Sequence, residues 1–566
     1  MSHSIYQWLS LVGIIWLQSF NGTNTDFPAY SSQLKKLLSI SQFQLNSLAF
    51  ASDAGKLLGW FSGVAANYLP LPVVLIIGAT LGLIGYGVQF LYVVQKTSHL
   101  SYVHIFLLNV LAGNSICWIN TVCYTSIIKN FPVDPQVAVG LATSYVGLSA
   151  KIYTDIVDVI SSSNDATAKA KNYLLLNSIL PLIVSLVTAP ILFKDVVSNN
   201  KENNGNILQI GFTIMFLVTI VTGVYSVIGS LGWKNVVQSP LLYAFGLSVL
   251  LIVVPLMIPV GVKIGKFLLK WWRTMKESKI FNLSMMEDHQ SANSTQESNP
   301  DVDVEMNELK EVIAQDSISS GFSGHDSGFR VQGPVEPIST SKEDIGVKVM
   351  VRRVEFWLYF FVYMFGGTLG LVFMNNLGQI AESRGQSSAT TSSLVSLSSA
   401  FCFFGRLLPS LVHHFSGDKY MISTTTSIAT LMTPISATFY LLAFNSSIVS
   451  LYISTVIIGL CIGSFTSISV SATTELFGTK NFSINHNIVV GNIPIGSLVF
   501  GTCAALLYEK KKKKSDHMNM MNICMGAECY RTTFIIWGCI SLLGTVLAFV
   551  LYLRTRKFDQ QKQLRI

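Results

Sequence analysis

About fourteen stretches of this sequence are apolar over the length that an α-helix needs to cross a lipid bilayer, roughly 20 residues. They are apolar nearly all round and contain frequent glycines, which is typical of helices packed in lipid; barrel strands are short and alternate in polarity. The sequence therefore predicts an all-α polytopic membrane protein with about 14 transmembrane helices. The stretches are 5–20, 44–67, 72–94, 102–128, 136–159, 172–193, 207–231, 241–269, 354–378, 391–413, 421–443, 448–472, 485–508 and 532–553.

Composition supports this class. Half of the residues are hydrophobic and 12% are charged, against roughly 25% in a soluble globular chain. Charged side chains are concentrated in residues 270–353, so the rest of the chain lacks the charged surface that faces water in a soluble domain. Disulfide-rich, collagen-like and wholly disordered proteins are excluded. A basic nucleic-acid-binding protein is also excluded, because the net charge of +8 comes from dispersed clusters.

The first apolar stretch, 5–20, is expected to be a retained helix. It has no basic start and no A-x-A-like cleavage site, which argues against a secretory signal. A polar run, Asn21 to Asp26, follows it directly. Such a run at membrane depth must line a cavity or be buried by protein, or else the helix ends before it.

The segment 271–350 is long, polar and acidic, and we expect a disordered loop there. Basic residues flank it on both sides, which indicates the cytoplasmic face of the membrane. Eight stretches precede this loop and six follow it, so both termini are expected to be cytoplasmic as well. The basic tail 556–566 agrees with this topology.

One loop conflicts with that topology. The lysine run from Lys510 to Lys514 lies between the last two stretches, on the side expected to be extracytoplasmic. The same loop contains Cys524 and Cys529, which could form a local disulfide there; the alternative is two free thiols. If the lysine run is cytoplasmic instead, the helix count is wrong by one.

The arrangement suggests a transporter with two six-helix halves. We expect an N-terminal six-helix bundle, two additional helices, the loop, a C-terminal six-helix bundle and a tail. The corresponding ranges are 1–200, 201–270, 271–350, 351–555 and 556–566.

Several segments resemble a plant protein family. FPAYSSQLKKLLSISQFQLNSLAFASDAGKLLGWFSG at 27–63, AGNSICWINTVCYTSIIKNFP at 112–132 and GLATSYVGLSAKIYTDIVD at 140–158 are similar to the nodulin-like domain. The C-terminal half is similar to the Nuclear Fusion Defective 4-like proteins. Its matching segments are VRRVEFWLYFFVYMFGGTLGLVFMNNLGQIAESRG at 351–385, FFGRLLPSL at 403–411, SVSATTELFGTKNF at 470–482 and NIPIGSLVFG at 492–501.

This resemblance implies a branch of the major facilitator superfamily, in which two six-helix bundles enclose a central site and open alternately to the two membrane faces. It does not imply a particular substrate. Two departures affect the expected gate. The loop SGVAANYLPLP at 62–72 has no charge where the superfamily has a charged signature, and Val133 to Gln136 lack the family's basic residue.

Ionisable residues inside membrane helices are energetically costly, so each is a candidate for function. Asp53 and Lys56 are close enough on one helix to pair, either to bind substrate or protons or only to neutralise each other. Lys151 and Asp155 share one helix stripe, and the alternative for them is a solvated cluster at the helix end.

Arg406 could bind a carboxylate through two parallel hydrogen bonds, or it could belong to a cytoplasmic gate. Asp418, Lys419 and Glu475 fit such a gate. Uncharged polar side chains are further candidates for the substrate path, with helix packing as the alternative. They are Asn109, Asn120, Tyr145, Asn375, Asn376 and Asn492.

The sequence predicts a secondary active transporter of a small solute, with a mild preference for an organic anion, driven by an ion or solute gradient. The alternative is a non-transporting protein of the same fold that acts as a sensor or scaffold. No enzyme, cofactor, ATP-binding or metal-binding motif is found. Expected partners are the lipid bilayer, the solute and protons, without nucleic acid, in the plasma membrane or an endomembrane; a monomer is compatible with the sequence.

Overall fold

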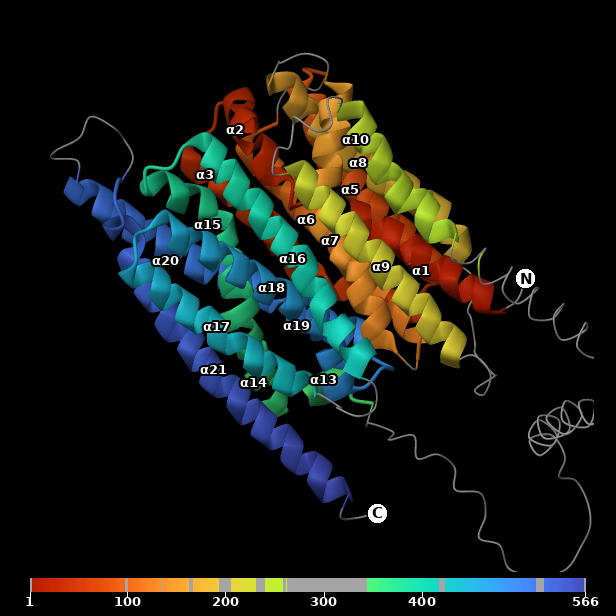
Figure 1. The fold of residues 1–566 in the computed structure, drawn as a ribbon. Helices are drawn as coiled ribbons and strands as arrows, with labels where there is room; N and C mark the ends of the chain where they lie inside the picture. Colours follow the sequence, from red (N-terminus) through yellow and green to blue (C-terminus); the bar gives the residue numbers. More distant parts are fainter. Residues whose placement is uncertain are drawn as a thin grey trace, which may run out of the picture. The chain divides into compact units, whose positions relative to one another are not determined.

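The computed structural model is helical in all its described regular elements, which fits a chain that must satisfy its backbone hydrogen bonds within lipid (Figure 1). One compact unit contains residues 1–262 and 342–566. The residues that the structure describes are 3–96, 100–132, 134–161, 166–192, 205–230, 240–257, 261, 344–416, 423–515 and 524–563.

The N-terminal part of the unit is built from long helices, two of which are interrupted. The elements are α1 (His3–Phe20), α2 (Phe27–Leu38), α3 (Gln42–Ala54), the 3₁₀ turn η1 (Gly55–Leu58), α4 (Trp60–Tyr68), α5 (Leu71–Val93), α6 (Tyr102–Asn130), α7 (Pro135–Ile160), α8 (Ala166–Leu192), α9 (Gly205–Ser230), α10 (Pro240–Ser248) and the π-turn η2 (Val249–Val253).

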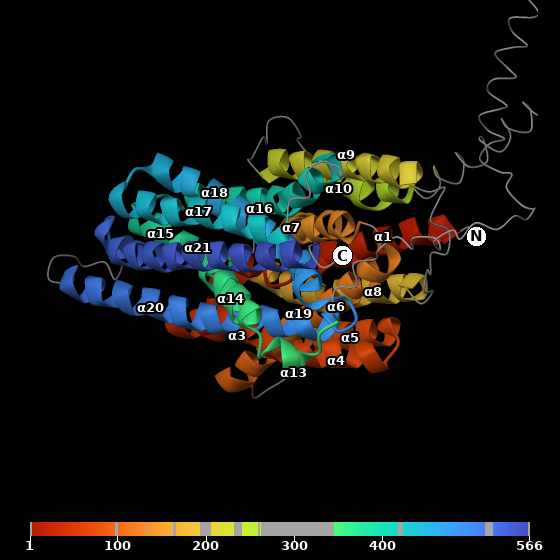
Figure 2. The same ribbon diagram turned by 90° about the horizontal axis from the view of Figure 1, so that it is seen from below.

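The C-terminal part is also built from long helices, some of which are interrupted. Its elements are α13 (Val347–Met350), α14 (Val354–Tyr363), the π-turn η3 (Met364–Thr368), α15 (Leu369–Ser383), α16 (Ser388–Ser416), α17 (Thr424–Phe444), α18 (Ile448–Phe477), α19 (Phe482–Val490), α20 (Asn492–Ser515) and α21 (Glu528–Gln563). Figure 2 shows the long helices of both parts running along a shared direction.

Within the described residues, ten helices are long and apolar enough to cross a membrane, and the expected count of about fourteen is not confirmed. Helix α7 is not among the ten, since its polar residues, including Lys151, Asp155 and Asp158, lower its mean hydropathy. The expected span 44–67 is also absent, because η1 divides it into two shorter helices. The expected span 241–269 is described only in part, and most of the expected loop lies outside the described residues.

The end of that loop is described and packs against the bundle. Asp344 accepts hydrogen bonds from the backbone amides of Thr479 and Lys480, each at 3.1 Å. The amide of Ile345 donates to the carbonyl of Phe477 at 3.1 Å. Residues 344–350 are therefore attached to the α18–α19 connection, which differs from the disorder expected up to residue 350.

Small residues allow close crossing of helices that the sequence places far apart. A side chain at Gly78 would lie 2.5 Å from the Cβ of Trp118, where α5 crosses α6. A side chain at Gly147 would lie 2.9 Å from the Cα of Phe403, where α7 crosses α16. The α7–α16 crossing joins the two halves of the chain, as is usual for helices associating through small residues in membranes.

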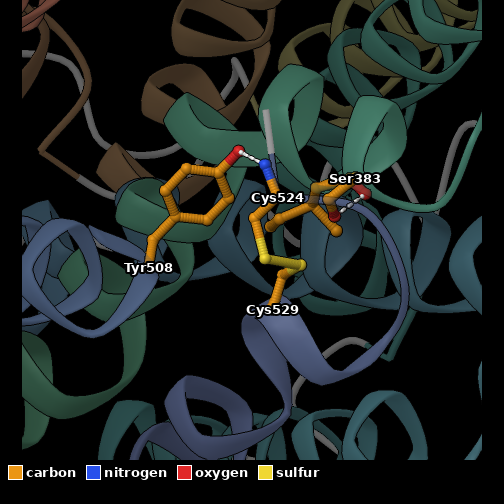
Figure 3. Close-up of a disulfide and its surroundings, with 5 residues drawn as sticks. Ser383, Tyr508, Cys524 and Cys529 are labelled. Atoms are coloured by element: carbon orange, nitrogen blue, oxygen red, sulfur yellow. Dashed lines mark hydrogen bonds between the residues drawn. A yellow bond between two sulfur atoms is a disulfide. The ribbon is translucent and has the colours of Figure 1, made fainter. Parts of the chain in front are cut away.

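We call the end of the bundle that contains α13 and the C-terminal end of α21 the inner end, and the opposite end the outer end (Figure 1). The α20–α21 connection lies at the outer end. There, Cys524 and Cys529 form a disulfide with a Cα–Cα distance of 6.0 Å. The amide of Gly526 donates to the carbonyl of Ser383 at 2.7 Å, and the amide of Cys524 donates to the hydroxyl of Tyr508 at 3.1 Å (Figure 3). The connection is thereby attached to the end of α15.

Candidate functional site

The acid and lysine of the second membrane stretch form a buried ion pair where the helix is interrupted. Lys56 Nζ lies 2.6 Å from Asp53 Oδ1, and the two side chains are 10% and 7% exposed. The 3₁₀ turn η1 begins at Gly55, whose carbonyl accepts a hydrogen bond from Asn114 at 3.0 Å. The interruption therefore leaves this carbonyl satisfied while it positions Lys56 beside its acid.

This ion pair also contacts the C-terminal half of the chain. The hydroxyl of Ser497, on α20, donates to Asp53 Oδ2 at 3.1 Å. Lys56 interacts electrostatically with Tyr363, the last residue of α14 before the π-turn η3. Local π-turns within long helices are frequent at functional sites. The pair therefore lies between the two halves of the protein.

Arg406 reaches the same region from α16. Its Nη1 donates to the carbonyl of Thr143, on α7, at 3.1 Å. Its Nε is buried and has no hydrogen-bond partner among the described residues. Arg406 interacts electrostatically with Tyr363 and with Tyr124 of α6. The guanidinium therefore retains an unused donor.

We call Asp53, Lys56, Tyr124, Tyr363 and Arg406 the central cluster. Its members come from α3, η1, α6, α14 and α16, and so from both halves of the chain. Two cations interact electrostatically with Tyr363, whereas one carboxylate, Asp53, is paired with one of them. The cluster thus has an excess of positive charge at the interface of the two halves, which favours an anionic ligand.

A polar contact between α19 and the N-terminal half lies on the inner side of this cluster. Asn487 Nδ2 donates to Thr121 Oγ1 at 2.8 Å, and the hydroxyls of Thr121 and Ser62 lie 2.7 Å apart. Ser483 donates to the carbonyl of Gly63 at 3.3 Å. The sequence analysis did not select these residues. The signal that could have identified them is the sequence Asn485 to Asn487, three consecutive polar residues at the start of an apolar stretch.

His486 is a second residue that the sequence analysis missed. It is 6% exposed and lies 3.1 Å from the hydroxyl of Thr473 through Nδ1. Its ring lies edge-on to Tyr124, with 5.6 Å between the ring centroids. His486 is therefore next to a member of the central cluster.

Lys151 and Asp155 form a pair of their own on α7, with Nζ and Oδ1 2.5 Å apart. Asp155 lines a largely apolar cavity of about 200 Å³ together with Trp16, Phe20 and Leu251. This cavity lies among helices of the N-terminal half. The structure therefore does not bring this pair into the central cluster.

The other polar candidates are engaged mainly in helix packing contacts. The hydroxyl of Tyr145 lies 3.1 Å from that of Thr219, on α9. Asn109 donates a hydrogen bond to Gln89, and Asn376 donates to a carbonyl of its own helix. Asn120 accepts from Gln18 and Asn21, and Asn492 accepts from Thr368 at 2.6 Å. Asn375 is exposed. A role for them in the substrate path stays a prediction.

The expected gate is described only in part. Glu475 accepts hydrogen bonds from the hydroxyls of Ser423, at 3.3 Å, and Thr424, at 2.5 Å, where α17 begins. An acid at a helix N-terminus is favourable for the helix dipole, so this contact stabilises α17. Asp418 and Lys419 lie outside the described residues.

Comparisons with known proteins cover nearly the whole chain. The Nodulin-like family model matches residues 7–260, and the model of the NFD4 C-terminal domain matches residues 340–560. Protein NUCLEAR FUSION DEFECTIVE 4 of Arabidopsis thaliana is 37% identical over 561 residues, which are 97% of this chain and 89% of that protein.

Among solved structures, a proton:xylose symporter of the major facilitator superfamily, XylE bound to 6-bromo-6-deoxy-D-glucose, matches with a TM-score of 0.53. The match covers 97% of this chain and 96% of that one at 12% sequence identity. This likeness shows a shared fold, and it confirms the all-helical major facilitator architecture expected from the sequence.

Proposed function

Because the chain belongs to the nodulin-like family with an NFD4 C-terminal domain and has the major facilitator fold, we propose that it is a secondary active transporter that moves a small solute by alternating access. We further propose that the solute is an organic anion. The absence of an ATP-binding motif from the sequence is consistent with an ion or solute gradient as the driving force.

The observation that carries this proposal is the central cluster. Lys56 and Arg406 come from opposite halves of the chain and interact electrostatically with one tyrosine. Lys56 is neutralised by Asp53, whereas Arg406 has a buried Nε without a partner among the described residues. A guanidinium can form two parallel hydrogen bonds with a carboxylate, so Arg406 is the group that would bind the anion.

The contacts between the halves support alternating access. On the N-terminal side they involve Thr143, in the first half of α7, and Ser62 and Gly63, in the first half of α4, which runs from η1 toward the inner end (Figure 2). Their partners include Ser483 and Asn487, near the inner start of α19. These hydrogen bonds thus close the inner side of the interface, and we infer that they break when the carrier opens inward.

Transport by the purified protein in sealed lipid vesicles tests the proposal. A panel of labelled monocarboxylates, dicarboxylates and neutral sugars is offered with and without an imposed pH gradient. We expect carboxylate uptake by the wild type. We expect a loss of about 10- to 100-fold in Arg406→Ala, since an interaction with a charged group is worth roughly 1.5–3 kcal/mol. Arg406→Lys should retain more uptake than Arg406→Ala.

Arg531→Ala is the matched control. Arg531 is an exposed arginine that pairs with Glu528 at 2.8 Å, outside the central cluster. Uptake by this variant should equal that of the wild type. Uptake of neutral sugars in place of carboxylates by the wild type, or carboxylate uptake by Arg406→Ala equal to that of the wild type, would contradict the anion assignment. No uptake of any solute by correctly folded wild-type protein would contradict transport and favour the sensor or scaffold alternative.

A further inference from the structure

The first membrane helix is interrupted by a polar segment that is largely covered by protein, with only Thr25 exposed. Helix α1 ends at Phe20 and α2 begins at Phe27. Between them, Asn21 and Asp26 are each 1% exposed. The amide of Gly22 donates to the hydroxyl of Ser149 at 3.2 Å, and Asn21 donates to Asn120 at 2.9 Å. The interruption is thus held in place by α6 and α7.

Asp26 is a buried acid with few hydrogen bonds. Its Oδ1 accepts one hydrogen bond, from Asn177 of α8 at 3.2 Å, and its Oδ2 has no partner among the described residues. Although Asp26 is the N-cap of α2, its side chain accepts no hydrogen bond from the amides of that helix. Among the described residues, no lysine, arginine or histidine forms an ion pair with it.

Four tyrosines from four helices interact electrostatically with Asp26: Tyr30 of α2, Tyr86 of α5, Tyr153 of α7 and Tyr173 of α8. Three of their hydroxyls donate elsewhere: Tyr86 to Thr23, Tyr153 to the carbonyl of Phe20, and Tyr173 to Thr154. The hydroxyl protons of these three tyrosines are therefore not available to the carboxyl group, and the fourth tyrosine, Tyr30, interacts with Asn177, the same residue that binds Asp26.

The atoms left without partners indicate what is missing. Asp26 Oδ2 and Asn177 Oδ1 are both buried acceptors without a donor. A buried carboxylate without a cation or donors is strongly disfavoured, and the group becomes neutral by binding a proton. A proton on Asp26 would remove the buried charge and would add the one O–H donor that this site lacks.

We propose that Asp26 is the proton-binding site of this protein: its carboxyl group binds a proton in the inner-closed conformation and releases it when the α1–α2 interruption rearranges. The coupled ion would then be a proton. This inference rests on the proposed function for its role in coupling, but not for the protonation of Asp26 itself.

A chain of ionisable groups connects this site with the outer end of α7. Tyr173 interacts electrostatically with Asp26, Asp155 and Asp158. Asp158 is half-exposed and pairs with Lys169 at 2.7 Å. Both acids are paired with lysines, Asp155 with Lys151 and Asp158 with Lys169, and they mark the outer end of α7 as the side from which a proton would reach Asp26.

Infrared spectroscopy of the full-length protein in vesicles of ether-linked lipid, which has no ester carbonyl group, tests the protonation directly. A neutral carboxylic acid has a carbonyl stretching band that a carboxylate lacks. We expect such a band at neutral pH in the wild type and its loss in Asp26→Asn, which preserves the shape of the side chain. Glu528→Gln is the control, because Glu528 is 65% exposed and pairs with Arg531; it should leave the band unchanged.

Three results would overturn the inference: no band in the wild type, a band that persists in Asp26→Asn, or a band that disappears when sodium replaces a large organic cation in the buffer. The last result would identify Asp26 as a sodium site. Each of these outcomes is independent of whether any solute is transported.

Transport in the same vesicles tests coupling. With a solute identified in the vesicle screen, Asp26→Asn should still exchange labelled for unlabelled solute but should lose accumulation driven by a pH gradient. Continued accumulation by Asp26→Asn would contradict the inference while leaving transport established. If the wild type moved no solute, the proposed function would fail, and the infrared result would still decide whether Asp26 binds a proton.

Discussion

Two acid–lysine pairs lie on helices of the N-terminal half with nearly the same spacing, yet the structure gives them different surroundings. Asp53 and Lys56 are both buried, at the interface between the halves, and Ser497 of the C-terminal half binds the acid. Lys151 is 21% exposed and its partner Asp155 lines a cavity within the N-terminal half. Spacing therefore determines that each pair forms, whereas helix orientation determines whether a pair can take part in transport.

The largest effect is expected from Lys56→Ala. This change leaves Asp53 as a buried charge without its cation, which should lower the free energy of unfolding by about 3–5 kcal/mol and abolish uptake. Thermal unfolding in detergent and vesicle uptake measure the two effects. The double change Asp53→Asn with Lys56→Met removes both charges, so it should restore most of the stability without restoring uptake.

An intermediate effect is expected from Lys151→Ala. The lysine that is lost is 21% exposed, against 10% for Lys56, so we expect a smaller loss of about 1–3 kcal/mol in the free energy of unfolding. Uptake should remain measurable, because the pair lies outside the central cluster. The comparison would be reversed if Lys151→Ala abolished uptake while Lys56→Ala transported normally.

The smallest effect is expected from Ser497→Ala. It removes one hydrogen bond to Asp53 and keeps the ion pair, so the free energy of unfolding should fall by about 1 kcal/mol. Uptake should be reduced by less than in either lysine variant. Ser47→Ala is a suitable control, since the hydroxyl of Ser47 bonds only within its own helix, to the carbonyl of Phe43; uptake that fell equally in both serine variants would contradict a role for the cross-half contact.

The membrane helices are predicted well from the sequence, because a helix that contacts lipid must be apolar along its own length. The sequence predicts the count less well, because a stretch such as 44–67 has the length and mean polarity of one membrane helix and still contains the 3₁₀ turn at Gly55. That turn is stabilised by Asn114, which lies on another helix. Tertiary contacts of this kind leave no trace in hydropathy.

The candidate site could be predicted only in part for a related reason. The pairing of Asp53 with Lys56 follows from their spacing on one helix. The positions of Arg406 and Tyr363 beside that pair depend on how the two halves pack, which spacing does not report. In the sequence, Asp26 is only part of a polar run that either lines a cavity, is buried by protein or follows the end of the helix. Its burial depends on contacts such as the hydrogen bond from Asn177, which is 151 residues away in the chain.

The outer connection between α20 and α21 has a consequence for biosynthesis. Disulfides form in oxidising compartments, so the pairing of Cys524 with Cys529 favours the expected topology, in which this hairpin tip lies outside the cytosol. The tip then carries the lysines that extend α20, against the usual charge bias of membrane insertion. We expect the folding of the α20–α21 hairpin to depend on the secretory folding machinery. The hydrogen bond between Gly526 and Ser383 should form only after α20 and α21 have both crossed the bilayer.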